Sequence, residues 1–267
     1  MEETSSILTA VLLIGGFIAA PLLYLQHQRN PPNAEYLTEI ISERSWSTRQ
    51  VVILLSTLFL LYFFAGFAGL FFYEEQIPYA QLAITLSIYT ILTVMIGCTN
   101  QRNGGRWAGK LGMESSTLWK LCLAPIVYLA VIPFIILISV GNHLLVEQFS
   151  TSEVELQGIA EMVSGNLSGL QICYILTAIF AAPIYEELLF RGVLFPYCVR
   201  RTGLIPATVA VSALFAVLHY HLPSFAPLFA LSVVLCLTYR RTGSLWTSIG
   251  VHMIFNAVSI LALNISG

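Results

Sequence analysis

Eight apolar runs, each near the length needed to cross a lipid bilayer, constrain the fold of this chain more than any other feature. A spanning α-helix needs about 20 predominantly apolar residues, because each residue advances only about 1.5 Å across the hydrocarbon core. We therefore expect an all-α polytopic membrane bundle of about eight transmembrane helices. The runs are approximately Ile7–Leu25, Val51–Tyr73, Tyr79–Cys98, Leu121–Val146, Leu170–Phe195, Leu204–Tyr220, Leu222–Tyr239 and Leu245–Leu263.

Composition excludes an ordinary water-soluble domain. Only 10% of the residues are charged and 57% are hydrophobic, whereas soluble domains carry roughly 25% charged residues. The mean hydropathy is +0.80. The sixth and seventh runs are separated only by the His221 region and Pro223, so one of the two could be tilted or partly re-entrant.

The basic residues predict the orientation of the bundle. All but one of the twelve Lys and Arg residues fall in alternate connections between the runs, and the exception is Arg191. The positive-inside rule places those connections in the cytoplasm, so both termini lie outside, as an even number of crossings requires. The acidic connection from Glu147 to Glu161 is then external. The basic residues in question are Arg29, Arg44, Arg49, Arg102, Arg106, Lys110, Lys120, Arg200, Arg201, Arg240 and Arg241.

Three charges interrupt the fifth run, in the stretch IYEELLFRGVLFP that begins at Ile184. A charge at mid-bilayer costs about 2.5–3.5 kcal/mol on insertion scales, so it usually faces the bundle and has a partner. Glu187 and Arg191 are four residues apart, on one helix face and in the favourable order for an ion pair. Glu186 is rotated by about 100° from Glu187 and points elsewhere. The alternative is that all three charges form a buried ion-pair network that only locks helices together.

Two later runs add further polar residues. The sixth contains FAVLH, from Phe215 to His219, and the eighth contains HMIFN, from His252 to Asn256. If the fifth and sixth helices are antiparallel about Gly203, Glu186 and His219 lie at nearly the same height. The eighth helix then brings Asn256 within about 5 Å of that level, and His252 about one turn nearer the cytoplasm.

This layer of polar groups predicts hydrolytic chemistry by one of two routes. A carboxylate beside a neutral imidazole can take a proton from water, and an amide such as Asn256 can donate to a developing oxyanion. Alternatively, Glu186, His219 and His252 could hold Zn2+ and polarise a water molecule. Both routes end in the hydrolysis of an acyl bond, and the sequence leaves the cofactor open between none and zinc.

The three motifs together resemble the CPBP family of CAAX-protease and bacteriocin-processing (Abi) intramembrane peptidases, which include the type II CAAX prenyl endopeptidases. The resemblance covers roughly Leu170 to Ile260. It implies that Glu186 and His219 activate the attacking water, and that His252 and Asn256 complete the catalytic site. It also implies that Glu187, Arg191 and Phe215 support these residues. Family members have been described both as metallopeptidases and as metal-free glutamate enzymes.

From this resemblance we expect an intramembrane endopeptidase of a bacterial cell membrane, acting on a membrane-associated protein or peptide, which could be lipidated. Its other partner is the lipid bilayer, and we expect no nucleic-acid partner. Residues 1–120 would supply N-terminal helices and cytoplasmic loops, and residues 121–267 the catalytic helical core, within one membrane domain. Two other readings remain open: a proton-coupled membrane transporter, and a non-catalytic scaffold or immunity protein with the same fold.

Overall fold

The computed structural model shows an all-helical chain, and it describes residues 2–29, 34–44, 46–68, 71, 77–101, 107–149 and 168–266. No strand occurs among these residues, which confirms the predicted fold class. Residues 150–161, most of the predicted acidic connection, lie outside the described residues. The elements are α1 (Glu2–Arg29), α2 (Ala34–Glu43), α3 (Thr48–Ala68), α4 (Ile77–Gln101), α5 (Trp107–Leu111), η3 (Ser115–Leu123), α6 (Ala124–Phe149), α8 (Gly169–Leu176), η4 (Thr177–Ala181), α9 (Ala182–Leu189), η5 (Phe190–Leu194), α10 (Phe195–Thr202), α11 (Leu204–Val217), α12 (Leu222–Thr242) and α13 (Leu245–Ser266).

Each predicted apolar run corresponds to a helix over most of its described residues. In the described part of the chain, six helical stretches are long and apolar enough to cross a membrane, and two shorter apolar helices accompany them. This pattern fits a multi-pass membrane protein. The six are Thr48–Ala68, Ile77–Thr99, Gly109–Asn142, Gly169–Thr202, Leu222–Thr242 and Leu245–Leu263, and the shorter two are Thr9–Leu23 and Leu204–Val217.

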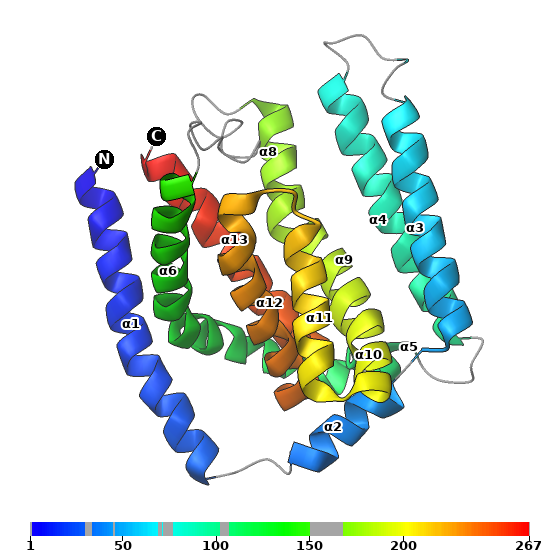
Figure 1. Cartoon of the computed structure of the whole chain (residues 1–267), viewed down its shortest axis with the longest axis horizontal. Coiled ribbons are helices and arrows are strands. Elements are labelled where there is room, and N and C mark those ends of the chain that lie inside the picture. The colour runs from blue at the N-terminus through cyan, green and yellow to red at the C-terminus, as the bar shows by residue number, and fades with distance from the viewer. Residues whose placement is uncertain are drawn as a thin grey trace.

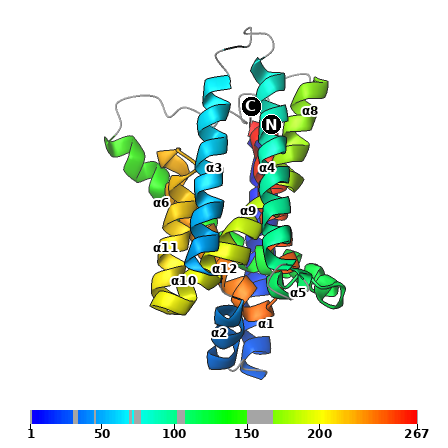
Figure 2. The same ribbon diagram turned by 90° about the vertical axis from the view of Figure 1, so that its right-hand side faces the viewer.

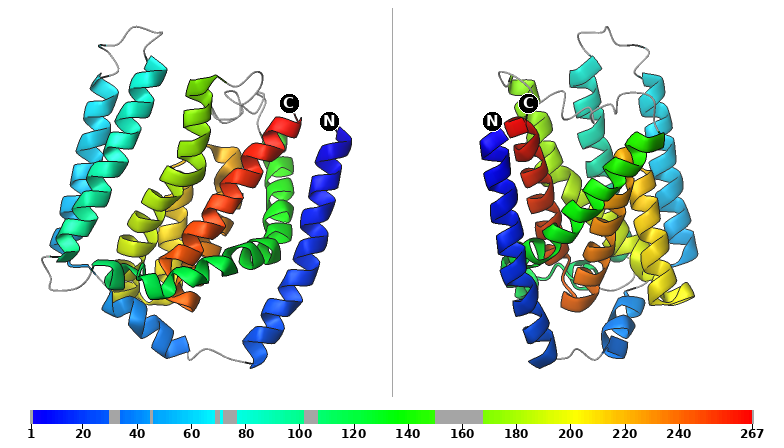
Figure 3. Two further views of the ribbon diagram at one scale, coloured as in Figure 1. Left: turned by 180° about the vertical axis from the view of Figure 1, so that it is seen from behind. Right: turned by 60° about the vertical axis from the view of Figure 1, so that its left-hand side comes forward.

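The late helices form the centre of the bundle (Figure 1). Helix α12 contacts α11, α6 and α13, while α1 packs along α6 and also contacts α13. Helices α3 and α4 run side by side at the edge of the molecule, and α4 contacts α9 (Figure 2). Both termini lie at the same end of the bundle (Figure 3).

At the opposite end of the bundle, basic side chains donate hydrogen bonds to backbone carbonyls between α12 and α13. The Arg44 guanidinium donates to the Gly243 carbonyl at 2.8 Å, and Lys120 Nζ donates to the Thr242 carbonyl at 2.6 Å. Thr242 is the last residue of α12 and Gly243 directly follows it, at the end of the helix where backbone acceptors have no partner within the helix. Gly243 ends α12 in the left-handed conformation, with φ of 62°. The cations therefore stabilise the tight turn from which α13 starts.

Two π-helical segments flank α9, the short helix that carries the paired glutamates. In η4 the Ala182 N–H bonds to the Thr177 carbonyl, and in η5 the Phe195 N–H bonds to the Phe190 carbonyl. A proline follows each segment by two residues. Because a proline ring clashes with the carbonyl of the preceding turn and has no N–H to donate, the wider π-turn suits the sequence at these points.

The indole of Trp46 satisfies a carbonyl that the second proline frees. Pro196 has no N–H for the carbonyl of Gly192, four residues earlier. Trp46 Nε1 donates to that carbonyl at 2.9 Å, and only 4% of the Trp46 surface is exposed. Trp46, two residues before α3, therefore stabilises the turn that directly follows Arg191.

We expect Trp46→Phe to lower the free energy of unfolding by about 1–3 kcal/mol, because it leaves a buried carbonyl without a donor. Urea unfolding of the purified protein in detergent measures this. Trp119→Phe is the matched control, since Trp119 is 63% exposed and its replacement should change stability little. Equal effects of the two substitutions would show that the Trp46 hydrogen bond contributes nothing.

One helix boundary differs from the prediction and changes the setting of His219. The sixth run was expected to stay helical to Tyr220, but α11 ends at Val217. The His219 N–H turns back to the Ala216 carbonyl at 3.3 Å, and Tyr220 adopts a positive φ of 50°. His219 thus lies in the turn that leads to α12, not within a helix. Helix α12 starts at Leu222, directly before Pro223, which suits a first helical turn.

Candidate active site

Glu187 and Arg191 form the buried ion pair that their spacing predicts. Arg191 Nη1 donates to Glu187 Oε1 at 2.7 Å, and both side chains are 0% exposed. The other guanidinium nitrogen, Nη2, donates to the hydroxyl of Ser232 on α12 at 2.7 Å and to its carbonyl at 3.1 Å. A buried charge needs its remaining hydrogen bonds satisfied. Ser232 therefore supplies both acceptors of Arg191 Nη2, while Arg191 Nε has no partner among the described residues, and the pair joins α9 to α12.

His252 lies between the two glutamates. Its Nδ1 is 3.0 Å from Glu187 Oε1, and its Nε2 is 3.7 Å from Glu186 Oε2. An ionised carboxylate only accepts hydrogen bonds, so Nδ1 of His252 is the donor to Glu187, and in the neutral form of the ring Nε2 is an acceptor. Glu187 thus orients the ring, and the free nitrogen of His252 is directed towards Glu186.

Glu186 is the more accessible carboxylate of the pair. Its side chain is 19% exposed, compared with 0% for Glu187. The 3.7 Å separation from His252 Nε2 exceeds a direct hydrogen bond, and a water molecule can bridge groups at such distances. The two adjacent glutamates therefore differ as the helix geometry predicts: one is paired and buried, and the other is available.

His219 has the same arrangement as His252, with one ring nitrogen anchored and the other left over. Its Nδ1 is 2.7 Å from the Phe215 carbonyl, which is an obligatory acceptor, so Nδ1 carries the proton. The backbone N–H of His219 points to Ala216 instead. At the end of α11 the imidazole Nδ1 therefore binds the Phe215 carbonyl in place of the backbone N–H of His219. The other ring nitrogen, Nε2, is an acceptor with no partner among the described residues.

Phe215 is packed among the charged and aromatic groups of the site. Its ring centroid lies 4.7 Å from that of His219 and 5.7 Å from that of His252. The Arg191 guanidinium carbon lies 4.9 Å from the same ring centroid, within the range of a cation–π contact. Phe215 is fully buried, so one aromatic side chain fixes the spacing of two imidazoles and a guanidinium.

Asn256 satisfies the carbonyl that the first proline frees. The Ala178 carbonyl has no partner further along the helix, because Ala182 donates to Thr177 and Pro183 has no N–H. Asn256 Nδ2 donates to Ala178 at 2.8 Å. An amide nitrogen carries two hydrogens, so this bond positions the side chain and leaves a second donor.

This constellation coincides with a recognised family segment. Residues 168–258 match the Rce1-like family of type II CAAX prenyl endopeptidases. The match covers about a third of the chain and confirms the resemblance inferred from the motifs. No curated protein and no solved structure matches the chain. The family supports a CAAX-type intramembrane protease.

The Rce1-like segment contains all seven residues predicted from the sequence, and the structure adds others around them. Ser232 of α12 was missed, although a serine in the middle of the apolar stretch from Pro227 to Leu237 is a signal of a buried polar partner. The Tyr89 ring of α4 stacks on Tyr185, the neighbour of Glu186, at 4.4 Å between ring centroids, so an edge helix outside the Rce1-like segment also borders the site.

The side chains of the Rce1-like segment do not assemble a three-ligand zinc site in this arrangement. No group of three His, Cys, Asp or Glu side chains that could hold a metal ion occurs among the described residues, which include Glu186, His219 and His252. The Nδ1 atoms of His219 and His252 have other acceptors, and each Nε2 is left over, as is also usual for metal-binding histidines. Because no three-ligand group is assembled, the chemistry below is derived without a metal.

Proposed function

We propose that the chain is an intramembrane endopeptidase that hydrolyses a peptide bond of a membrane-associated substrate with a water molecule activated by Glu186. The observation that carries this proposal is the pairing of an accessible carboxylate with a neutral imidazole. Glu186 lies 3.7 Å from His252 Nε2, and Glu187 fixes the His252 tautomer from the other side. A positioned carboxylate of this kind is suited to general base catalysis.

In the proposed reaction, Glu186 removes a proton from water held between its carboxylate and His252 Nε2. The resulting hydroxide attacks the carbonyl carbon, and the carbonyl oxygen becomes an oxyanion. The second N–H of the Asn256 amide and a hydrogen-bond donor of the substrate itself stabilise that charge. Glu186 then returns its proton to the leaving amine as the C–N bond breaks. His219 Nε2 is available to orient the water or the amine.

We further propose that the substrate is a peptide segment at the membrane, and that a lipid group could anchor it. The Rce1-like name refers to prenyl endopeptidases acting on CAAX sequences, which makes prenylated peptides the first class to test. Matched peptides with and without the prenyl group, presented in nanodiscs, separate the two cases. Cleavage of both at equal rates would exclude lipid recognition.

A comparison of peptide N-termini tests the function without a chosen substrate. Membranes from cells that carry the wild-type chain should contain new N-termini that are absent from cells carrying His252→Ala. Metal analysis of the purified wild-type and His252→Ala proteins checks the metal-free mechanism. Identical N-terminal profiles, together with a proteoliposome flux that depends on Glu186, would instead favour the transporter.

We expect Asn256→Ala to lower kcat by about 10²–10³-fold, the usual cost of removing one oxyanion donor. Because the substitution also leaves the Ala178 carbonyl unpaired, it should reduce stability by about 1–3 kcal/mol. Asn256→Gln keeps the amide but moves it by one methylene, and Asn142→Ala is a control. Asn142 Nδ2 donates to the Pro223 carbonyl at 2.7 Å, so its loss tests stability alone. If Asn256→Ala shows the expected loss of stability but an unchanged kcat, the role of Asn256 is purely structural.

For the orientation, we propose cytoplasmic basic connections and external termini. The support is the gathering of Arg44, Lys120 and the last turns of α10 and α12 at the end of the bundle opposite the termini. Protease protection of terminal tags in intact and inverted vesicles measures it. Cleavage of the tags only in inverted vesicles would reverse the orientation.

A further inference from the structure

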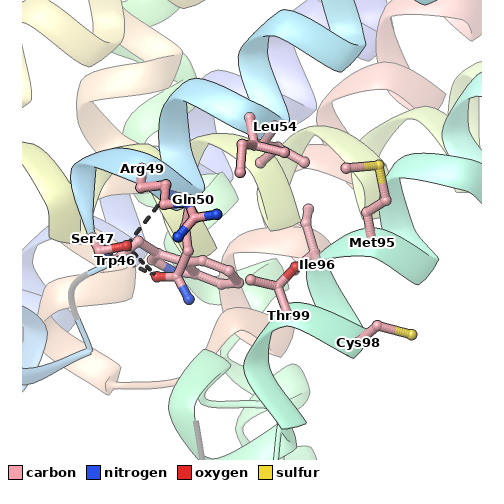
Figure 4. Close-up of a pocket in the computed structure, with 10 residues that line it drawn as sticks. Trp46, Ser47, Arg49, Gln50, Leu54, Met95, Ile96, Cys98 and Thr99 are labelled. Atoms are coloured by element: carbon pink, nitrogen blue, oxygen red, sulfur yellow. Dashed lines mark hydrogen bonds between the residues drawn. The ribbon is translucent and has the colours of Figure 1, made fainter. Parts of the chain in front are cut away.

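A cavity of about 600 Å³ lies between the start of α3 and the end of α4, outside the Rce1-like segment. Trp46, Arg49 and Gln50 face it from one side, and Met95, Ile96 and Thr99 from the other (Figure 4). Its volume lies within the roughly 300–1,000 Å³ typical of sites for small organic ligands. None of the seven predicted catalytic or supporting residues lines it.

The cavity lies at the ends of two apolar spans. The apolar span of α3 begins at Thr48, and that of α4 ends at Thr99. The polar lining, Ser47, Arg49, Gln50 and Thr99, lies at these ends. Ile53, Leu54 and Met95 line the part that continues into the apolar spans. A ligand that fills the cavity therefore needs a polar head and an apolar body.

The positive charge in the polar part of the cavity lining favours an anionic ligand. Arg49 is the one charged residue in the described lining, which contains no carboxylate. The Arg49 side chain is exposed and forms no hydrogen bond or ion pair with any described residue. Among the described residues it has no counter-charge to displace, unlike Arg191 in the candidate active site.

The start of α3 adds a second attraction for an anion. Ser47 and Gln50 form a reciprocal capping box, with the Ser47 N–H on Gln50 Oε1 at 2.9 Å and the Gln50 N–H on Ser47 Oγ at 3.3 Å. The N–H groups of Thr48 and Arg49 keep no partner within the helix, and the first turn contains no acidic residue. The positive end of the helix macrodipole is thus directed to the same end of the cavity as Arg49.

We propose that this cavity binds the phosphate of an anionic phospholipid, with one acyl chain lying against Ile53, Leu54 and Met95. The phosphate pairs with the Arg49 guanidinium and the first turn of α3. The apolar lining favours a lipid over a free phosphate ion, because inorganic phosphate would leave the apolar part of the cavity empty. The neighbouring basic end of the bundle adds attraction for an anionic membrane surface.

The test is native mass spectrometry of the detergent-purified chain titrated with phosphatidylglycerol or with phosphatidylcholine. The wild-type protein should retain phosphatidylglycerol in preference to phosphatidylcholine. Arg49→Gln should weaken phosphatidylglycerol binding about fivefold or more, since one basic residue near an anionic surface contributes about 1 kcal/mol. Met95→Trp should reduce retention of both lipids by filling the cavity while Arg49 stays in place.

Arg200→Gln is the matched control, because Arg200 is an exposed arginine at the end of α10 and does not line the cavity. It should leave lipid retention unchanged. Equal losses for Arg200→Gln and Arg49→Gln would show general surface attraction and overturn the site. Displacement of the lipid by inorganic phosphate at equal concentration would also overturn it, in favour of a free-anion site. The binding readout is independent of peptide cleavage, so failure of the proposed protease activity leaves this test intact.

Discussion

Replacement of Glu186 by glutamine should abolish measurable peptide cleavage while the protein still inserts and folds. The substitution keeps the size and hydrogen-bonding capacity of the side chain but removes the base, so we expect kcat to fall by about 10²–10⁴-fold. The side chain is 19% exposed and lies outside the buried Glu187–Arg191 pair. Stability should therefore change little. Single-turnover cleavage of a peptide in nanodiscs, beside urea unfolding of the same preparation, measures both quantities.

A second glutamate substitution gives the contrast that makes this result informative. Glu187→Gln removes the negative charge beside the buried Arg191 and His252, so it should lower stability and activity together. Loss of activity in Glu186→Gln without loss of stability would separate catalytic from structural glutamates. Retained cleavage by Glu186→Gln would rule out its role as the base. Normal cellular function of a cleavage-dead Glu186→Gln variant would favour the scaffold interpretation.

Arg191→Met should produce the largest loss of stability among the substitutions considered, about 3–5 kcal/mol. Removing one partner of a buried ion pair leaves an uncompensated charge, which is the costly outcome in such pairs. Glu187 would keep a charge at 0% exposure with only His252 as a polar partner at 3.0 Å. Unfolding in detergent, or the yield of folded protein, measures this loss.

The double variant Glu187→Gln/Arg191→Met distinguishes an ion-pair effect from loss of packing. Because neither charge remains, most of the lost stability should return. Activity should stay low, since His252 has lost the anion that fixes its tautomer. Arg201→Met is the control, as Arg201 is exposed and lies over the Tyr197 ring at 3.7 Å. A double variant no more stable than Arg191→Met would show that the side-chain volume, not the charge, matters.

The parts predicted from the sequence are those set by distance along a single helix. Hydropathy located the apolar spans, and the i, i+4 spacing identified the Glu187–Arg191 pair, which the structure contains at 2.7 Å. Neither inference needs knowledge of neighbouring helices. The same holds for the different settings of Glu186 and Glu187, because a rotation of about 100° separates adjacent residues.

The details that escaped prediction depend on rotation about the helix axis and on partners far away in the chain. The heights of the side chains along the bundle were predicted for uniform α-helices. That prediction could not include the π-helical segments at Thr177–Ala181 and Phe190–Leu194, each of which changes the direction in which later side chains point. It could not show that the histidine beside Glu186 is His252. His219 was expected inside a helix, but the chain turns there towards Pro223. Ser232 is linked to Arg191 only through tertiary packing.

The two freed carbonyls of the glutamate-bearing span also have a consequence for biogenesis. Ala178 receives its donor from Asn256, 78 positions later, and Gly192 receives its donor from Trp46, 146 positions earlier. A nascent chain that has inserted only the span from Gly169 to Thr202 has the glutamates in the membrane without the amide that completes their surroundings. We therefore expect the proposed hydrolytic centre to be complete only after the final span, α13, has inserted. A ribosome-stalled or truncated product that lacks this span should have no peptidase activity.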